Sequence, residues 1–261
     1  MKKPNFLDIH FEGMDDNGAK LREILDRDIP CALSIAPYTF RKGWYDDDVL
    51  GLAYDAVRRE GSVLGQQGNM HKCKHKHRFV DPWHENHCLY GWSLSKDEQR
   101  ELIEKGRETL KKRLGVNPEM YVPPNHQFNM ATLDVAIQMK YKVFAIRGLK
   151  TSEPLTYANV HGPIVVLPEV KLSNDGTTHY VHYDEIENQR EQYEKALESV
   201  IPFSGIRVNF PENGSPNRNS IIRRMLDDDL RDIKRNLGAT NRRKFLRDVW
   251  RFPARFFGRL E

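Results

Sequence analysis

The chain has 261 residues, of which 39% are hydrophobic, 10% aromatic and 30% charged, and its formal net charge is +4. This length is enough for one large domain with a sizeable core, and the aromatic content excludes a chain that is disordered throughout. No stretch approaches about 18 consecutive apolar residues, which excludes a membrane-spanning helix, and no apolar segment follows the charged N-terminus, so we expect no signal peptide. Three cysteines cannot form a disulfide framework, which favours a cytoplasmic protein, and the small net charge argues against a nucleic-acid partner.

Segments with strand and helix patterns alternate from residue 5 to residue 200. Residues 5–12 alternate apolar and polar side chains, which predicts a strand with Asp8, His10 and Glu12 on one face. Residues 30–36 are almost entirely apolar, as is typical of a parallel strand that is covered on both faces. In chain order we expect strands at 5–12, 30–36, 62–65, 120–122, 142–146, 162–167 and 179–181, and helices at 20–27, 46–59, 95–114, 132–140 and 184–200.

The alternation predicts an α/β fold with right-handed crossovers, and both a barrel and a doubly wound sheet satisfy it. The most clearly marked helix begins at Ser95, where Ser95 and Glu98 form a capping-box pattern, and it ends before Gly115. In either architecture the active site belongs at the carboxyl ends of the strands. Polar residues stand at these ends, at Glu12, 66–75, 123–126 and His182.

Five of the ten histidines lie within residues 71–87. His71 and His75 are spaced four residues apart, and imidazoles in such a segment can converge on one metal ion, for which zinc is suited. Asp8 or Glu12 at the end of the first strand could supply a carboxylate ligand. The alternative is a solvated basic loop, because lysines are interleaved with these histidines and nearby cations oppose metal binding.

The histidine cluster continues with His84 and His87, in a segment that Pro82 marks as a loop. These two histidines either complete the same metal site or bind substrate hydroxyls together with Trp83 and Trp92.

Two segments that follow predicted strands carry further candidates. Pro123 and Pro124 fix the loop after one strand and present Asn125 and His126 to the site, unless the segment is only a structural turn. His182 follows the last strand, where a histidine with a tunable pKa suits a general acid, and the alternative is a surface histidine.

The character of the chain changes after about residue 205, which predicts a first domain over 1–205 and an extension over 206–261. The extension contains a polar loop, an amphipathic helix at 221–237, and a tail from residue 241 with seven Arg or Lys residues and many bulky apolar ones. Such a tail fits a helix docked on the first domain, a helix on a membrane surface, or a contact with a partner or nucleic acid. Membrane contact through 241–261 would hold the protein at the inner membrane surface.

Several motifs, in order, resemble the polysaccharide deacetylase superfamily, the carbohydrate esterase family four fold. The segment Gly65-Gln-Gln-Gly-Asn-Met-His71 is similar to that family's histidine motif after its third strand. Leu114-Gly-Val-Asn-Pro-Glu-Met-Tyr-Val-Pro-Pro resembles the stretch that leads into its substrate loop, and residues 129–147 resemble its next helix and strand. The resemblance spans about residues 5–200, and it implies a distorted (β/α)7-type barrel, here followed by a helical, basic C-terminal extension.

The resemblance implies a metal-dependent hydrolase that removes an acyl group from an N-acylated sugar or a related amide. The substrate is then a carbohydrate, and the cofactor is a divalent metal for which zinc is the expected ion. One carboxylate takes a proton from water, and a histidine protonates the departing amine. The implied residues are His71, His75 and Asp16 for the metal, Asp8, Glu12 and His182 for catalysis, and Trp92, Pro124, Asn125 and His126 for substrate binding.

Two features depart from the family pattern. The family has two adjacent aspartates at the end of strand one, where this chain has His10-Phe11-Glu12-Gly13, and in one register of the histidine motif Gln67 stands in place of a ligand. The departures leave three possibilities: a shifted metal site, a different acyl substrate, or lost activity. Two alternatives to the enzyme are therefore a catalytically inactive, carbohydrate-binding deacetylase-like protein and a membrane-associated scaffold that acts through its tail.

Overall fold

The computed structural model describes residues 6–11, 18–38, 47–70, 85, 93–147, 154–172 and 178–202. Strands and helices alternate along these residues, as the sequence predicts. The strands are β1 Phe6–Phe11, β2 Ala32–Ile35, β3 Val63–Gln67, β4 Met120–Val122, β5 Val143–Arg147, β6 Leu155–Asn159, β7 Gly162–Lys171 and β8 Thr178–His182. The helices are α1 Ala19–Asp26, α2 Asp47–Arg58, α3 Lys96–Leu114, α4 Met130–Gln138 and α5 Arg190–Leu197, with 3-10 turns η1 Pro124–His126, η2 Tyr183–Glu185 and η3 Glu187–Gln189.

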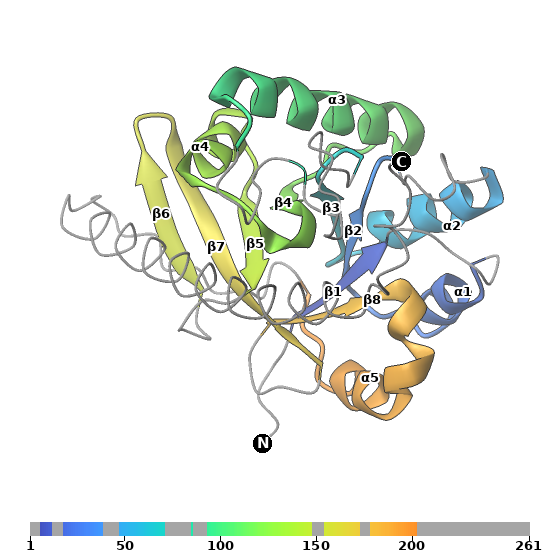
Figure 1. The fold of residues 1–261 in the computed structure, drawn as a ribbon. Coiled ribbons are helices and arrows are strands. Elements are labelled where there is room, and N and C mark those ends of the chain that lie inside the picture. Colours follow the sequence, from blue (N-terminus) through green and yellow to red (C-terminus); the bar gives the residue numbers. More distant parts are fainter. Residues whose placement is uncertain are drawn as a thin grey trace, which may run out of the picture.

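Seven parallel strands form a closed barrel, with helices on its outside (Figure 1). The strand order is β5-β4-β3-β2-β1-β8-β7, and parallel pairing between β5 and β7 closes the ring. The strand β6 pairs antiparallel with β7 and stands outside the ring as one arm of a hairpin. Closure decides between the two architectures that the sequence left open, and it confirms the (β/α)7-type barrel.

The barrel interior is apolar toward the amino ends of the strands. Its side chains form a buried cluster to which only strands contribute: Phe6, Ala32, Val63, Met120, Val122, Val143, Ala145, Val165 and Leu167. Side chains two residues apart on a strand share a face, so Asp8 and His10 follow Phe6 into the interior. The interior therefore changes from apolar to polar toward the carboxyl ends of the strands, and this change positions the candidate site.

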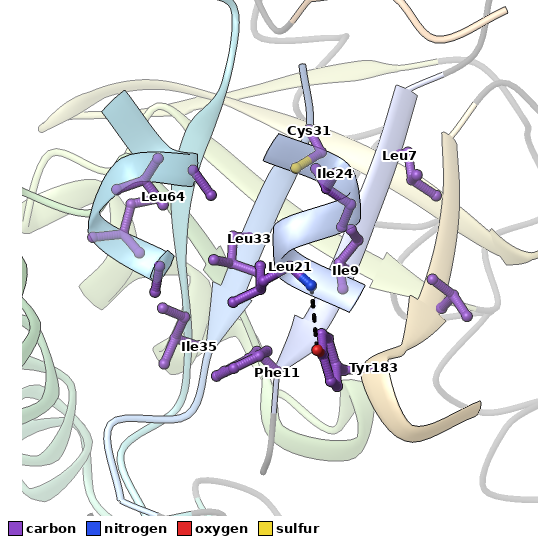
Figure 2. Packing of buried hydrophobic residues seen from close by; sticks show 14 of the residues in the cluster. Leu7, Ile9, Phe11, Leu21, Ile24, Cys31, Leu33, Ile35, Leu64 and Tyr183 are labelled. Carbon is purple, nitrogen blue, oxygen red and sulfur yellow. Dashed lines mark hydrogen bonds between the residues drawn. The ribbon is translucent and has the colours of Figure 1, made fainter. Parts of the chain in front are cut away.

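The other face of β1 packs against the surrounding helices. Leu7 and Ile9 point away from the interior and lie with Leu21 and Ile24 of α1 in the largest buried apolar cluster (Figure 2). The start of α1 has no side-chain cap at its first residue, and the hydroxyl of Tyr183 instead accepts the backbone N–H groups of residues 20 and 21. These hydrogen bonds connect the end of β8 to the helix that follows β1. The two strands therefore end side by side at the carboxyl end of the barrel, which we call its mouth.

Helix α3 has the ends that the sequence predicts. Ser95 accepts the backbone N–H of Glu98, the Glu98 side chain accepts the backbone N–H of Ser95, and the helix stops at Gly115 with φ 64°. Two elements differ from expectation. The strand β6 was not predicted, because its mixed side chains give no alternation, and the last helix covers only Arg190–Leu197 because two 3-10 turns precede it.

The extension over 206–261, its predicted helix at 221–237 and its basic tail lie outside the described residues, and so does the domain boundary at 205. Within the part of the chain that the structure describes, none of the helices combines the length and the apolar character needed to cross a bilayer.

Candidate active site

The structure describes half of the residues that the sequence singled out. Asp8, Pro124, Asn125, His126 and His182 are described, whereas Glu12, Asp16, His71, His75 and Trp92 lie outside the described residues. Asp8, His126 and His182 come together at the carboxyl end of the barrel, around a residue to which the sequence analysis gave no role. Pro124 is buried and Asn125 half-buried in the turn that precedes His126.

That residue is His10, which occupies the centre of the mouth and is 1% exposed. Its Nε2 lies 3.2 Å from Oδ2 of Asp8, and the Ser34 hydroxyl donates to the same oxygen at 3.0 Å. On the other side of the ring, Nδ1 lies 3.4 Å from the side-chain nitrogen of Gln67. The ring of Tyr180 stacks on the imidazole with centroids 5.0 Å apart. His10 is therefore held in one orientation by contacts from β1, β3 and β8, and Ser34 of β2 holds its partner Asp8.

His126 reaches the same mouth from an unusual backbone turn. Asn125 and His126 have φ of 52° and 54°, in the left-handed region that non-glycine residues rarely adopt. The turn is held by a hydrogen bond from the His126 N–H to the Pro123 carbonyl at 2.7 Å, and Nδ1 of His126 accepts the backbone N–H of Arg147 at 3.2 Å. Two consecutive strained residues persist only when their surroundings enforce them, and such strain is concentrated at functional sites.

The fourth member of the cluster is Glu169, a fully buried carboxylate from β7. Its Oε2 lies 3.6 Å from Nε2 of His10 and 3.6 Å from Nδ1 of His126. These separations are too long for good hydrogen bonds. In the described part of the chain, neither carboxylate oxygen of Glu169 has a hydrogen-bond partner, although leaving such a group unpaired in a protein interior is costly.

The donor set fits a metal cation. His10, His126 and Glu169 each offer one ligand atom, and these atoms all lie within 4.8 Å of one another. Two ligand atoms of a tetrahedral zinc ion, at bond lengths of roughly 2.1 Å, stand about 3.4 Å apart, which is close to the two contacts of Glu169. Because a ring nitrogen has one lone pair, a cation at Nδ1 of His126 would take the place of the hydrogen bond from the Arg147 N–H. Imidazole and carboxylate are both common zinc ligands. The orphaned Glu169 oxygens are thus arranged as a cation would require.

The cluster also has a distinctive charge state. Burial lowers the pKa of His10, but the negative charge of Asp8 and its hydrogen bond to the ring, together with the nearby carboxyl group of Glu169, outweigh it and raise the pKa to about 10. Burial and the charge of Asp8 raise the pKa of Glu169 to about 8. Burial opposes ionisation of Asp8, yet the charge and hydrogen bonds of His10 lower its pKa. Without a metal, neutral pH therefore favours ionised Asp8, protonated His10 and neutral Glu169.

Arg147 and His182 lie above this cluster, at its rim. Arg147 is exposed and donates from Nη1 to the Tyr180 hydroxyl at 2.9 Å. His182 is half-buried, and the edge of its ring faces His10 with centroids 5.3 Å apart. The half-burial leaves His182 able to meet solvent and the cluster together, as its predicted role as an acid requires.

The sequence analysis gave no role to three residues of the site: His10, Glu169 and Arg147. Two of them, His10 and Glu169, had a signal in the sequence. His10 shares a predicted strand face with Asp8, so its inward direction was visible, although a lone histidine on a strand names no partner. Glu169 lies on the same face of β7 as Val165 and Leu167. The predicted strand ended at residue 167, whereas β7 continues to Lys171. Arg147 gave no signal, because the predicted strand ended one residue before it.

Comparisons with known proteins give relatives by fold. No protein-family model matches the chain, and no curated protein sequence matches it. The chain is similar to a 4-alpha-glucanotransferase from Thermococcus litoralis at 11% identity and a TM-score of 0.53, over 81% of this chain and 41% of that one. It is also similar to the Xyl-CE4 domain of a multidomain xylanase from the hindgut metagenome of Trinervitermes trinervoides, at 12% identity and a TM-score of 0.49, over 79% and 90% of the two chains.

A third similar structure is that of a CE4 family pseudoenzyme from Bacillus anthracis, at 13% identity and a TM-score of 0.49, over 78% of this chain and 65% of that one. At such identities the likeness is one of fold. Proteins of carbohydrate esterase family four are therefore among the solved structures to which this barrel is similar, and the function has to be argued from the site itself.

Proposed function

We propose that this chain is a metal-dependent hydrolase that removes an acyl group from an N-acylated sugar or a related amide. The observation that carries the proposal is the convergence of His10, His126 and Glu169 at the carboxyl mouth of the barrel, with their ligand atoms within 4.8 Å of one another. The substrate class rests on the sequence resemblance to polysaccharide deacetylases. The expected ion is zinc.

The residues around the cluster support the steps of an amide hydrolysis. A divalent cation, when bound, supplies a water of lowered pKa and polarises the amide carbonyl. Asp8 uses Oδ2 for His10 and Ser34, while its Oδ1 has no hydrogen-bond partner among the described residues and is able to accept a proton from water. His182 at the rim is the group that donates a proton to the departing amine.

The test is the metal content of the purified full chain after exchange into zinc-containing buffer. We expect one zinc per chain, loss of zinc in His126→Ala and in Glu169→Gln, and no change in His161→Ala. The control residue His161 lies at the exposed turn between β6 and β7, where only its backbone makes described hydrogen bonds. Zinc retained by both cluster variants, or a wild-type chain that takes up none, would refute this ligand set.

His71→Ala belongs in the same experiment, because the sequence predicts His71, His75 and Asp16 as ligands. Loss of zinc in His71→Ala with full retention in Glu169→Gln would move the site to the histidine-rich segment. The reaction is tested by the release of acetate and of a primary amine from N-acetylglucosamine oligomers. The hydrolase would be refuted if the zinc-loaded protein released acetate neither from these oligomers nor from simple N-acetyl amides.

One observation favours the alternative, a carbohydrate-binding protein without activity. The His10 and Glu169 side chains are 0% exposed and His126 is 7% exposed, and His10 already has an ionic partner in Asp8. A closed network of this kind can be structural. In that case the chain binds N-acetylglucosamine oligomers, takes up no zinc and releases no acetate.

A further inference from the structure

Arg147 is the one arginine in the described part of the chain that ends a barrel strand at the mouth. It is in phase with Val143 and Ala145, which line the interior, so the side chain starts over the barrel and not outside it. Its Cα is paired with that of Glu169 on β7, and its backbone N–H donates to Nδ1 of His126. Arg147 is therefore built into the same site as the candidate metal ligands.

The guanidinium of Arg147 is held at one corner. Nη1 donates to the hydroxyl of Tyr180 at 2.9 Å, and Tyr180 is 1% exposed and stacks on His10. Within the described ranges, this is the only hydrogen bond that the guanidinium makes, and no ion pair with a carboxylate accompanies it. Arg190, on the outer surface, is by contrast bonded to Glu23. Arg147 as a whole is exposed.

This arrangement suits recognition of an oxyanion. The planar guanidinium offers donors in a fork that matches two oxygens of a carboxylate or a phosphate, and such charge-assisted pairs are about twice as strong as neutral hydrogen bonds. Because the Tyr180 hydroxyl already orders one end of the group, binding costs less side-chain entropy than it would for a free arginine. A neutral sugar needs no such cation, since neutral polar groups are enough to bind its hydroxyls.

The electrostatics of the mouth point in the same direction. In the cluster below, the charges of Asp8 and His10 offset one another. Arg147 is thus a cation at the rim without a carboxylate partner among the described residues, and it can orient an anionic substrate with its neutral acyl group toward the cluster.

We infer that Arg147 binds an oxyanion of the substrate, so that the N-acylated compound carries a carboxylate or a phosphate group. The inference rests on the proposed function, because it names the substrate class of the same mouth. It assigns Arg147 to specificity and leaves the reacting amide to the cluster below.

The experiment measures binding and not turnover. Calorimetric titrations of the full chain, at low salt, use three probes that share one ring: N-acetylglucosamine, its 1-phosphate, and the corresponding uronate. We expect one or both anionic probes to bind at least about tenfold more tightly than the neutral sugar, as a charge-assisted hydrogen bond of about 1.5 kcal/mol would give. The stronger of the two anionic probes identifies the group as phosphate or carboxylate.

Two variants and one control assign the preference to Arg147. Arg147→Met is expected to abolish it, and Arg147→Lys to keep part of it, because a lysine preserves the charge without the fork. Arg113→Met makes the same charge change in the last turn of α3, at the opposite end of the barrel, and should keep the full preference. The salt dependence of binding should be lost only in Arg147→Met.

Equal affinity of the wild-type chain for all three probes would overturn the inference, and so would an unchanged preference in Arg147→Met. These results are distinguishable from failure of the hydrolase proposal. An anion preference that depends on Arg147, in a chain that releases no acyl group, supports the inference and refutes the enzyme. Deacylation of neutral and anionic probes with equal kcat/KM supports the enzyme and overturns the inference.

Discussion

Glu169 provides a quantitative test of the buried charge cluster. Burial and the charge of Asp8 raise its pKa from 4.5 to about 8. Between these two values the folded protein keeps a proton that the unfolded chain has lost. Because the folded state then binds more protons, the free energy of unfolding falls as pH rises, by about 1.4 kcal/mol per pH unit for one proton. His10, with a pKa raised from 6.5 to about 10, adds a decline of the same sign between those values.

The assay is urea unfolding of the metal-free chain, in the presence of a chelator, at several pH values between about 5.5 and about 7.5. Over this range the Glu169 proton alone lowers the stability of the wild-type chain by roughly 3 kcal/mol. Glu169→Gln keeps the size of the side chain and removes the titration, so its stability should fall less over the same range. Parallel curves for the two chains would show that Glu169 is already ionised in the folded state and would refute the reasoning.

The stabilisation by zinc should have the opposite dependence on pH. Binding requires ionised Glu169 and neutral His10, so the stabilisation produced by a fixed zinc concentration should grow with pH in the wild-type chain. His126→Ala and Glu169→Gln should show little of this effect. Equal zinc stabilisation of all three chains, at all pH values, would place the ion elsewhere.

Three further predictions concern the glycines of two helices, a buried hydrogen bond to β3 and the residue Asn69 that follows this strand. Gly106→Ala should destabilise the fold by about 1–3 kcal/mol, because the added Cβ would clash with the side-chain nitrogen of Gln66 and lie 2.9 Å from the Gly68 carbonyl oxygen. A Cβ at Gly51 meets nothing within 4 Å, so Gly51→Ala should stabilise α2 by up to about 1 kcal/mol. Thermal unfolding of the matched pair tests this, and equal shifts of the two midpoints would contradict it. Tyr141→Phe removes a 2.5 Å hydrogen bond to buried Gln66 and should cost about 1–3 kcal/mol in urea unfolding, so an unchanged midpoint would argue against this bond. The side-chain amide of Asn69 is buried without a hydrogen-bond partner among the described residues, so Asn69→Leu should leave the unfolding midpoint unchanged or raise it. A large decrease of the midpoint would reveal a partner.

The sequence by itself determined the local elements and the side of the sheet on which chemistry had to lie. The alternation in β1 placed Asp8 and His10 on one face, and the capping pattern at Ser95 and Glu98 fixed the start of α3. These features depend on neighbours in the chain, because side-chain period and helix capping are local properties. The position of the site at the carboxyl ends of the strands followed from the alternation of strands and helices.

Only the tertiary structure decided that the sheet closes and which residues meet inside it. Closure depends on the pairing of β5 with β7, and that pairing sets Arg147 beside Glu169. His10 and Glu169 are far apart in the chain, and nothing local specifies their 3.6 Å contact. The shifted pKa values follow from the same burial and proximity, since desolvation and the field of a nearby charge arise only when distant strands come together. For that reason the sequence indicated a deacetylase-like barrel, while the metal-ligand set and the rim arginine came from the folded arrangement.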